Sequence, residues 1–168
     1  MEKRDLYDKN RKLIGKTITK NEVPPEGTYI QVVLIFIQNG EGKFLVQKRS
    51  KAKNGLFATT GGHPKSGETS KQGIIAEVKE EIGIDLNPDR VKWYFGGRSD
   101  EERVFWDDYY IQIDEIDIEK VKLQKEEVDS LYWFSADEII ELKKKGLFFL
   151  NHFEEFEELL RWLEKGKK

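Results

Sequence analysis

Residues 28–38, TYIQVVLIFIQ, form a long apolar stretch that constrains the fold more than any other segment of the chain. The stretch is rich in β-branched and aromatic residues, which favour extended structure. It is too apolar to turn one face toward water, as a half-exposed strand with alternating polar residues would. The sequence therefore predicts a central strand that is buried on both faces.

Further strands and helices are predicted around this strand. The strands outnumber the helices and do not alternate regularly with them, which is typical of an α+β fold with a mixed sheet flanked by helices. We expect a three-layer α/β/α sandwich. The predicted strands cover 5–19 as a hairpin, a turn and strand at 39–49, and 91–97, 103–113 and 131–135; the predicted helices begin at a capping hydroxyl near Thr69 or Ser70, at the capping Ser135, and near 149.

The length of 168 residues is that of one domain with a substantial core. We expect a single domain over 1–168, with an N-terminal hairpin extension at 1–25 and a C-terminal helix at 149–168. The apolar residues of that helix recur at helical spacing, which predicts a core-facing stripe, and a homodimer contact is the alternative.

Composition argues against several classes of partner. The net charge of -3 arises from 29 basic and 32 acidic residues, so the chain has no general attraction to nucleic acid or anionic membranes. The chain has no cysteine, which removes disulfides, thiolate ligands and thiol nucleophiles. No run approaches the ~18 apolar residues of a membrane span, and the N-terminus lacks an apolar signal segment. We expect a cytoplasmic protein that binds neither nucleic acid nor membranes.

Residues 61–84, GGHPKSGETSKQGIIAEVKEEIGI, place several glutamates on one short predicted helix. At ~100° per residue the isoleucines and Val78 share one arc, and Glu77, Glu80 and Glu81 share another about 120° away. Three carboxylates at this spacing can converge on a common point. Hard divalent cations such as Mg²⁺ bind oxygen ligands of this kind together with waters and substrate phosphates. On spacing alone, however, a solvated acidic face is the simpler interpretation.

The loop before the helix favours the metal interpretation. Its glycines, Gly61, Gly62 and Gly67, let the backbone approach a ligand closely, and Glu68 adds a further carboxylate. Loop and helix together resemble the signature of the Nudix hydrolases, and the flanking strands and the closing LYWFSADEII also resemble the Nudix fold. The signature positions are filled by Gly62, Glu68, Glu77, Val78, Glu80, Glu81, Gly83 and Ile84.

The resemblance implies hydrolysis of a diphosphate linked to another group, usually a nucleoside, with Mg²⁺ or Mn²⁺ as cofactor. Phosphoryl chemistry gains most from positioning and from cations that neutralise charge on oxygen, which is consistent with these residues. The resemblance assigns the metal to Glu77, Glu80 and Glu81, with a carbonyl of Gly61 or Gly62 as a further ligand. Glu68 would support the loop or the outer shell of the metal.

The attacking water also needs a base. Family members commonly take an extra glutamate from the loop before the last strand, which in this chain is LQKEEVDSLYW. The candidates are therefore Glu127 or Glu126 in addition to the helix residues Glu77 and Glu80. Both loop glutamates have the alternative interpretation of exposed surface charges.

Ala76 departs from the family pattern, which usually has arginine before the first helix glutamate. In the family, that arginine is thought to orient and support a glutamate, and a methyl group can do neither. The sequence thus allows two functions. The first is a metal-dependent pyrophosphohydrolase, and the second is a binding or regulatory module that keeps the fold and has lost efficient turnover.

A narrower likeness links the segments DLYDKNRKLIGKT, VQKRS and GGHPKSGE to the branch related to isopentenyl-diphosphate isomerase. That isomerase relies on a cysteine before a Gly-His-Pro segment and on a metal held largely by histidines. Gly61 occupies the cysteine position here, and the chain has only His63 and His152. Isomerase chemistry is therefore not expected.

The substrate is predicted to be a small diphosphate compound, nucleotide-like in character. Candidate phosphate contacts are Lys48 and Arg49, at the end of a strand near the loop, together with His63 and Arg98. Each has a simpler interpretation, as a solvated charge or a histidine bonded to the backbone. Aromatic side chains of the later strands, Trp106 among them, can stack on a base, although half of each strand must face the core.

Overall fold

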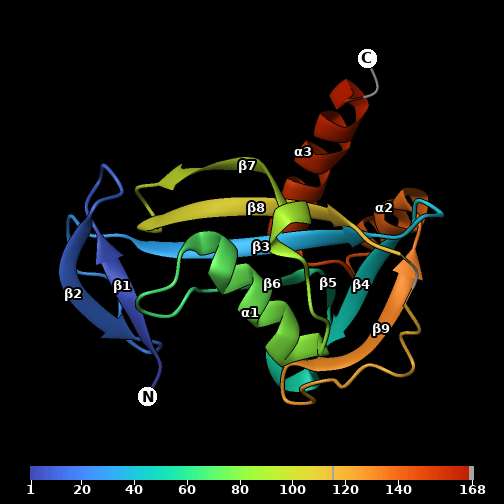
Figure 1. The fold of residues 1–168 in the computed structure, drawn as a ribbon, viewed down its shortest axis with the longest axis horizontal. Helices are drawn as coiled ribbons and strands as arrows, with labels where there is room; N and C mark the ends of the chain where they lie inside the picture. Colours follow the sequence, from blue (N-terminus) through green and yellow to red (C-terminus); the bar gives the residue numbers. More distant parts are fainter. Residues whose placement is uncertain (115, 167–168) are drawn as a thin grey trace.

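The computed structural model describes residues 1–114 and 116–166 (Figure 1). It contains a seven-stranded mixed sheet, a separate two-stranded hairpin and three α-helices. The strands are β1 (Lys3–Tyr7), β2 (Leu13–Thr19), β3 (Ile30–Gln38), β4 (Phe44–Arg49), β5 (Phe57–Ala58), β6 (Thr60–Gly62), β7 (Lys92–Ser99), β8 (Val104–Gln112) and β9 (Val128–Phe134). The helices are α1 (Ser70–Ile82), α2 (Ala136–Lys144) and α3 (Leu150–Gly166), with short 3₁₀ turns at Lys51–Lys53 and Pro88–Arg90.

The predicted central strand is β3, which pairs in parallel with β8 over its whole length, from Ile30 opposite Val104 to Gln38 opposite Gln112. Its other edge pairs antiparallel with the short β6, which carries the two glycines of the loop. The order β5-β4-β3-β8-β7 places β3 in the middle of the sheet, and β9 pairs with β4. Both parallel and antiparallel pairs occur, so the sheet is mixed as predicted.

Helices cover both faces of this sheet (Figure 1). On one face α1 packs with Ile74, Val78 and Ile82 against alternate residues of β3. On the other face α2 and α3 pack against the remaining residues of β3 and its neighbours, with Phe156 at the centre of an aromatic cluster. Because successive side chains of a strand point to opposite faces, β3 contributes to both layers and carries few polar residues. The three-layer α+β arrangement is confirmed.

Side-chain caps set the starts of α1 and α2. Thr69 accepts a hydrogen bond from the backbone N–H of Gln72, whose side chain returns a bond to the backbone of Thr69. Ser135 and Glu138 form the same reciprocal arrangement at α2. Each cap satisfies amides that the first helical turn leaves unpaired. In the described part of the chain, no helix has both the length and the apolar character needed to cross a membrane.

The hairpin β1–β2 lies beside the loop that precedes α1 (Figure 1). The carbonyl oxygen of Lys3 accepts a hydrogen bond from the Ser66 N–H at 2.7 Å. The Asp5 carboxylate accepts two more, from the Ser66 hydroxyl at 2.6 Å and the Gly67 N–H at 2.9 Å. The N-terminal extension therefore holds the glycine loop in place.

Candidate active site

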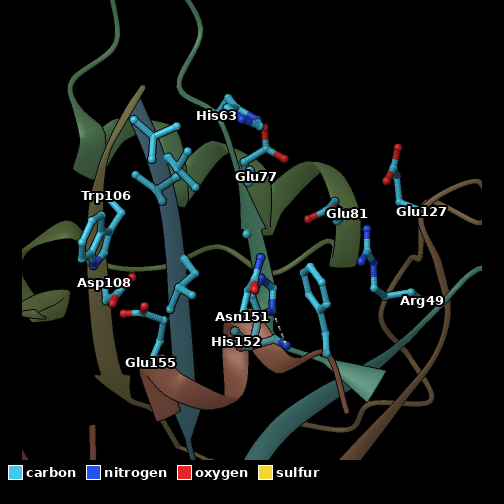
Figure 2. A pocket seen from close by; sticks show the side chains of 18 of the residues that line it. Arg49, His63, Glu77, Glu81, Trp106, Asp108, Glu127, Asn151, His152 and Glu155 are labelled. Atoms are coloured by element: carbon cyan, nitrogen blue, oxygen red, sulfur yellow. Dashed lines mark hydrogen bonds between the residues drawn. The ribbon is translucent and has the colours of Figure 1, made fainter. Parts of the chain in front are cut away.

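A cavity of about 780 Å³ opens between the sheet, the end of α1 and the start of α3. Its walls come from segments far apart in the sequence: β1, β3, β8, the β6 loop, α1, the segment before β9 and the first turns of α3. Figure 2 shows glutamates of α1 on one side and the start of α3 on the other. The volume is within the range of sites for small organic ligands.

Glu77 and Glu81 enter this cavity from successive turns of α1 (Figure 2). Burial raises the pKa of Glu77 to about 7, and the charge of Glu80 acts in the same direction. Burial raises the pKa of Glu81 to about 8, with the charges of Glu77 and Glu127 adding to the effect. The Oε2 atom of Glu81 is buried and has no hydrogen-bond partner. Burial and the neighbouring carboxylates thus outweigh the nearby cations, Lys65 at Glu77 and Arg49 and Lys53 at Glu81, and a further cation at this place would favour the charged forms.

Gly62 is required where it stands because Glu77 passes directly over it. A Cβ atom at residue 62 would lie 2.6 Å from Cδ of Glu77, well inside van der Waals contact. The position is in β6, whose pairing with Val33 of β3 fixes the backbone. The glycine of the signature thus provides the space in which a carboxylate of α1 sits.

We expect Gly62→Ala to lower kcat/KM about tenfold, because the added methyl displaces the Glu77 carboxylate and small misplacements are costly in catalysis. The clash is with a flexible side chain, so thermal unfolding should change little. Gly40→Ala is the matched control, since a Cβ there meets no atom within 4 Å. Equal activity of the two variants would show that Glu77 does not need its present position.

Glu80 differs from its two neighbours. Its side chain is 46% exposed and accepts a hydrogen bond from Lys65 Nζ at 2.5 Å, and the same ammonium lies 3.6 Å from Glu2. Glu80 borders the cavity mouth, whereas Glu77 and Glu81 lie inside. Among residues 1–114 and 116–166, no group of three or more His, Cys, Asp or Glu side chains is gathered closely enough to hold a metal by itself. The expected convergence of three carboxylates is therefore limited here to the pair of Glu77 and Glu81.

Glu127, from the loop before the last strand, lines the cavity on the same side as Glu81 (Figure 2). It forms an ion pair with Lys53 at 3.4 Å. Arg49 of β4 lines the same side, with its guanidinium 4.9 Å from the centre of the Phe149 ring. Glu126, the alternative to Glu127, is exposed and does not line the cavity.

Both histidines of the chain line the cavity. Burial lowers the pKa of His63 to about 4, and the charges of Arg4 and Lys20 act in the same direction. Burial and the charge of Arg49 lower the pKa of His152 to about 3. Both rings are therefore neutral near pH 7 and can form hydrogen bonds without carrying a positive charge. The Nδ1 atom of His152 accepts a hydrogen bond from the Thr59 N–H at 3.3 Å, which directs its protonated Nε2 elsewhere.

Three of the predicted site residues do not line the cavity. Glu68 accepts a hydrogen bond from the Lys65 N–H at 2.6 Å and so folds the glycine loop. The ammonium of Lys48 lies 5.7 Å from the centre of the Phe57 ring. Arg98 is held at the hairpin by the carbonyl oxygen of Lys9 and by Asp100. In this structure Glu68 therefore contacts the loop, and Lys48 and Arg98 make their contacts outside the cavity, so their predicted roles in binding metal or substrate stay predictions.

Four further residues line the cavity that the sequence does not identify as site residues. Each has a buried polar side-chain atom without a hydrogen-bond partner. They are Arg4, Asp108, Glu155 and Trp106, the last of which the sequence suggests only as an aromatic ring for stacking. Trp106 and Asp108 stand two apart on β8, a spacing that places them on one face of the strand. Arg4 and Glu155 come from opposite ends of the chain, so no local pattern could have joined them to the site.

The fold and the site together define a hydrolase of the kind that binds a phosphate anhydride beside a glycine loop and a glutamate-bearing helix. A model of the NUDIX domain matches residues 28–163, and the chain belongs to the Nudix family. Members of this family are hydrolases of pyrophosphate linkages and generally use divalent metals.

Comparisons with individual proteins agree with this assignment. The chain is 34% identical over 161 residues to an uncharacterised Nudix hydrolase of Listeria monocytogenes, a match that covers 90% of this chain and 92% of the relative. A crystal structure from Deinococcus radiodurans shares the fold with a TM-score of 0.68 at 20% identity, over 88% of this chain and 91% of that one. The NUDIX domain of Shewanella oneidensis NrtR, solved with ADP ribose, gives a TM-score of 0.62 at 14% identity, over 80% and 88%. The narrower isomerase-like branch stays a prediction.

Proposed function

We propose that the protein is a divalent-metal-dependent hydrolase that cleaves the diphosphate linkage of a nucleoside diphosphate derivative. The observation that carries this proposal is the pair of buried carboxylates, Glu77 and Glu81, at the wall of a ligand-sized cavity, with Glu127 beside Glu81. Neighbouring folds support a nucleotide-like substrate, since the NrtR domain was solved with ADP ribose.

The residues present fit a divalent cation. Mg²⁺ commonly binds proteins through one or two carboxylates and completes its shell with waters and substrate phosphates, so a cluster of three protein ligands is not required. Glu77 and Glu81 supply two such carboxylates, and one oxygen of Glu81 is buried without a partner. With the carbonyl oxygen of Gly61 or Gly62, and Glu80 at the cavity mouth, they would hold Mg²⁺ or Mn²⁺. When bound, the cation supplies charge neutralisation for the diphosphate.

The chain itself supplies the remaining functions. Arg49 and Lys53 place positive charge on the side of the cavity that carries Glu127, which favours the phosphate oxygens at that side. Glu127 is the proposed base for the attacking water, held in position by Lys53. The neutral histidines hydrogen-bond to the substrate, and the first amides of α3, next to the cavity, favour an anion.

The second function that the sequence allows, a binding module without efficient turnover, rested on Ala76. Cations lie beside the glutamates of α1 without an arginine at that position. Lys65 pairs with Glu80, and Arg4 of the hairpin lines the cavity together with Glu77. These contacts favour the hydrolase over the binding module.

The decisive assay incubates the protein with Mg²⁺ or Mn²⁺ and a panel of phosphate compounds, and quantifies the phosphate products. The panel contains nucleoside di- and triphosphates, nucleotide sugars, dinucleotide polyphosphates and prenyl diphosphates. We expect cleavage of at least one nucleoside diphosphate derivative that stops with EDTA and returns with added metal. Tight binding of a nucleotide without product, in the presence of either metal, would instead establish the binding module.

A further inference from the structure

Buried polar atoms without a partner are concentrated in one place. Over the described ranges, 1–114 and 116–166, five side-chain atoms are buried and lack a hydrogen-bond partner, and the residues of all five line the cavity. Such atoms carry a free-energy cost in a folded protein, and most native structures avoid them. Their gathering around one cavity indicates that a ligand provides the missing partners. Arg4 and Glu81 belong to the end that we assign to the diphosphate, and the other three form a separate group.

This second group consists of Trp106 Nε1 and Asp108 Oδ2 from β8 and Glu155 Oε2 from α3. Figure 2 shows the three side chains together on one side of the cavity, with Glu127 and Arg49 on the other side. Asp108 is among the most buried residues of the protein, at 1% exposure. We call these three residues the β8–α3 subsite.

Asp107, the neighbouring residue on β8, is an aspartate whose hydrogen-bond partners all come from the protein itself. Asp107 points to the opposite face, where it forms a salt bridge with Arg11 and accepts a hydrogen bond from Trp93 Nε1 at 2.9 Å. The carboxylate of Asp107 and the indole N–H of Trp93 therefore form a hydrogen bond with each other. The same two kinds of group, in Asp108 and Trp106, have no partner. A role in folding accounts for the first pair and leaves the second unexplained.

The polarity of the three atoms restricts the ligand. The carboxylates of Asp108 and Glu155 accept hydrogen bonds, whereas the indole N–H of Trp106 donates one. An ammonium group or a second cation would satisfy the carboxylates and leave the indole N–H facing a positive charge. Hydroxyl groups both donate and accept, so neighbouring hydroxyls on one ring satisfy all three atoms. Burial and the charge of Glu158 raise the pKa of Glu155 to about 7, so this carboxyl also donates in part of the population near neutral pH.

We propose that the β8–α3 subsite binds a polyhydroxylated group, such as a sugar ring, attached to the diphosphate, and that Trp106, Asp108 and Glu155 hydrogen-bond to its hydroxyls. This inference rests on the proposed function, because the diphosphate must lie at Glu77 and Glu81 for the attached group to reach the subsite. It names the substrate class as a nucleoside diphosphate sugar.

The test uses four compounds that vary the ring and the base separately: ADP-glucose, UDP-glucose, and the cyclohexyl esters of ADP and UDP. We expect kcat/KM to be about 10- to 100-fold higher for the glucose compounds than for the hydroxyl-free rings. Trp106→Phe and Asp108→Asn should each remove most of that preference and leave the cyclohexyl esters within about twofold of their original rate. Trp93→Phe, which removes an indole N–H outside the cavity, is the matched control and should keep the preference.

Thermal unfolding separates this role from a structural one. Because Asp108 carries an unpaired buried atom and its replacement by asparagine keeps its shape, Asp108→Asn should leave Tm unchanged or raise it, and a fall in Tm would indicate a structural role. Equal cleavage of glucose and cyclohexyl compounds by the unaltered protein overturns the subsite and leaves the proposed function standing. A base preference that disappears in Asp108→Asn shows that the subsite holds the base, which also overturns the inference. Cleavage of none of the four compounds counts against the proposed function itself.

Discussion

Glu81→Gln is expected to lower kcat/KM by about 10² to 10⁴, which corresponds to the loss of several kcal/mol of transition-state stabilisation by a cation. Glutamine has nearly the same shape, so the cavity is kept, and the charge that would attract the metal is lost. The expected change is measured as metal-dependent product formation over a range of Mg²⁺ and Mn²⁺ concentrations. Calorimetric titration of the metal into the variant should show weaker uptake than into the unaltered protein.

The same substitution should stabilise the metal-free protein. The pKa of Glu81 rises from 4.5 to about 8 in the folded state, so the folded state keeps its proton where the unfolded state has lost it. The glutamate therefore costs stability as pH rises from about 4.5, and the cost is complete above about pH 8. A tenfold change in a protonation equilibrium corresponds to about 1.4 kcal/mol. The free energy of unfolding of the variant should therefore exceed that of the unaltered protein by a few kcal/mol above about pH 8. The difference should shrink as the pH falls toward 4.5 and vanish near pH 3.

The control for both effects is Glu141→Gln, which changes an exposed glutamate of α2 that pairs with Lys144 at 3.6 Å. It should alter neither turnover nor the pH dependence of unfolding. Full activity of Glu81→Gln, with unchanged metal uptake, would remove this glutamate from the site. Loss of activity together with loss of stability would show instead that Glu81 supports the fold.

Much of the fold was predictable because its determinants are local. The composition of the apolar run that forms β3 predicts that this strand is buried. Thr69 and Ser135 identify the starts of α1 and α2, because each cap bonds to a residue only three positions away. The positions of Glu77 and Glu81 were also predictable, since a helix converts fixed spacing in sequence into a shared face. Glu127 needed the family resemblance, because nothing in its own loop distinguishes it from Glu126.

The rest depended on contacts between distant segments. Spacing placed Glu80 with its neighbours, and only the fold shows that Lys65 draws it to the cavity mouth. Likewise, Lys48 and Arg49 are adjacent in sequence, and strand alternation sends one to Phe57 and the other to the cavity. His152 stands 89 residues after His63, and the start of α3 brings its ring to the same cavity. Sequence periodicity carries no information on which elements will meet, so it could not place these side chains relative to the cavity.

Arg4→Met is expected to lower kcat about 100-fold, within the range for residues that orient the ligands of a metal. Arg4 comes from β1, lines the cavity with Glu77, and has a buried Nε atom without a partner. Burial lowers the pKa of Arg4, and the charges of Glu2 and Glu77 oppose that shift, which places its guanidinium within electrostatic reach of Glu77. On this prediction Arg4 is a positioning residue for Glu77 and stands in for the arginine absent at Ala76. Methionine keeps much of the length of the side chain and removes the charge.

The test of this role is rescue from another part of the chain. If Arg4 supports Glu77 electrostatically, Ala76→Arg should restore activity at least tenfold in Arg4→Met and add little to the unaltered protein, because the support is already present. Arg98→Met is the control, since Arg98 also bonds to the hairpin, through the carbonyl oxygen of Lys9 at 2.9 Å, and does not line the cavity. A loss of activity that follows Tm and is not restored by Ala76→Arg would mean that Arg4 serves only to dock the hairpin. If Ala76→Arg restores the activity of Arg4→Met, the N-terminal extension contributes a residue to the active site. The arginine that the family has at position 76 is then replaced by Arg4, which lies 72 residues earlier in the chain.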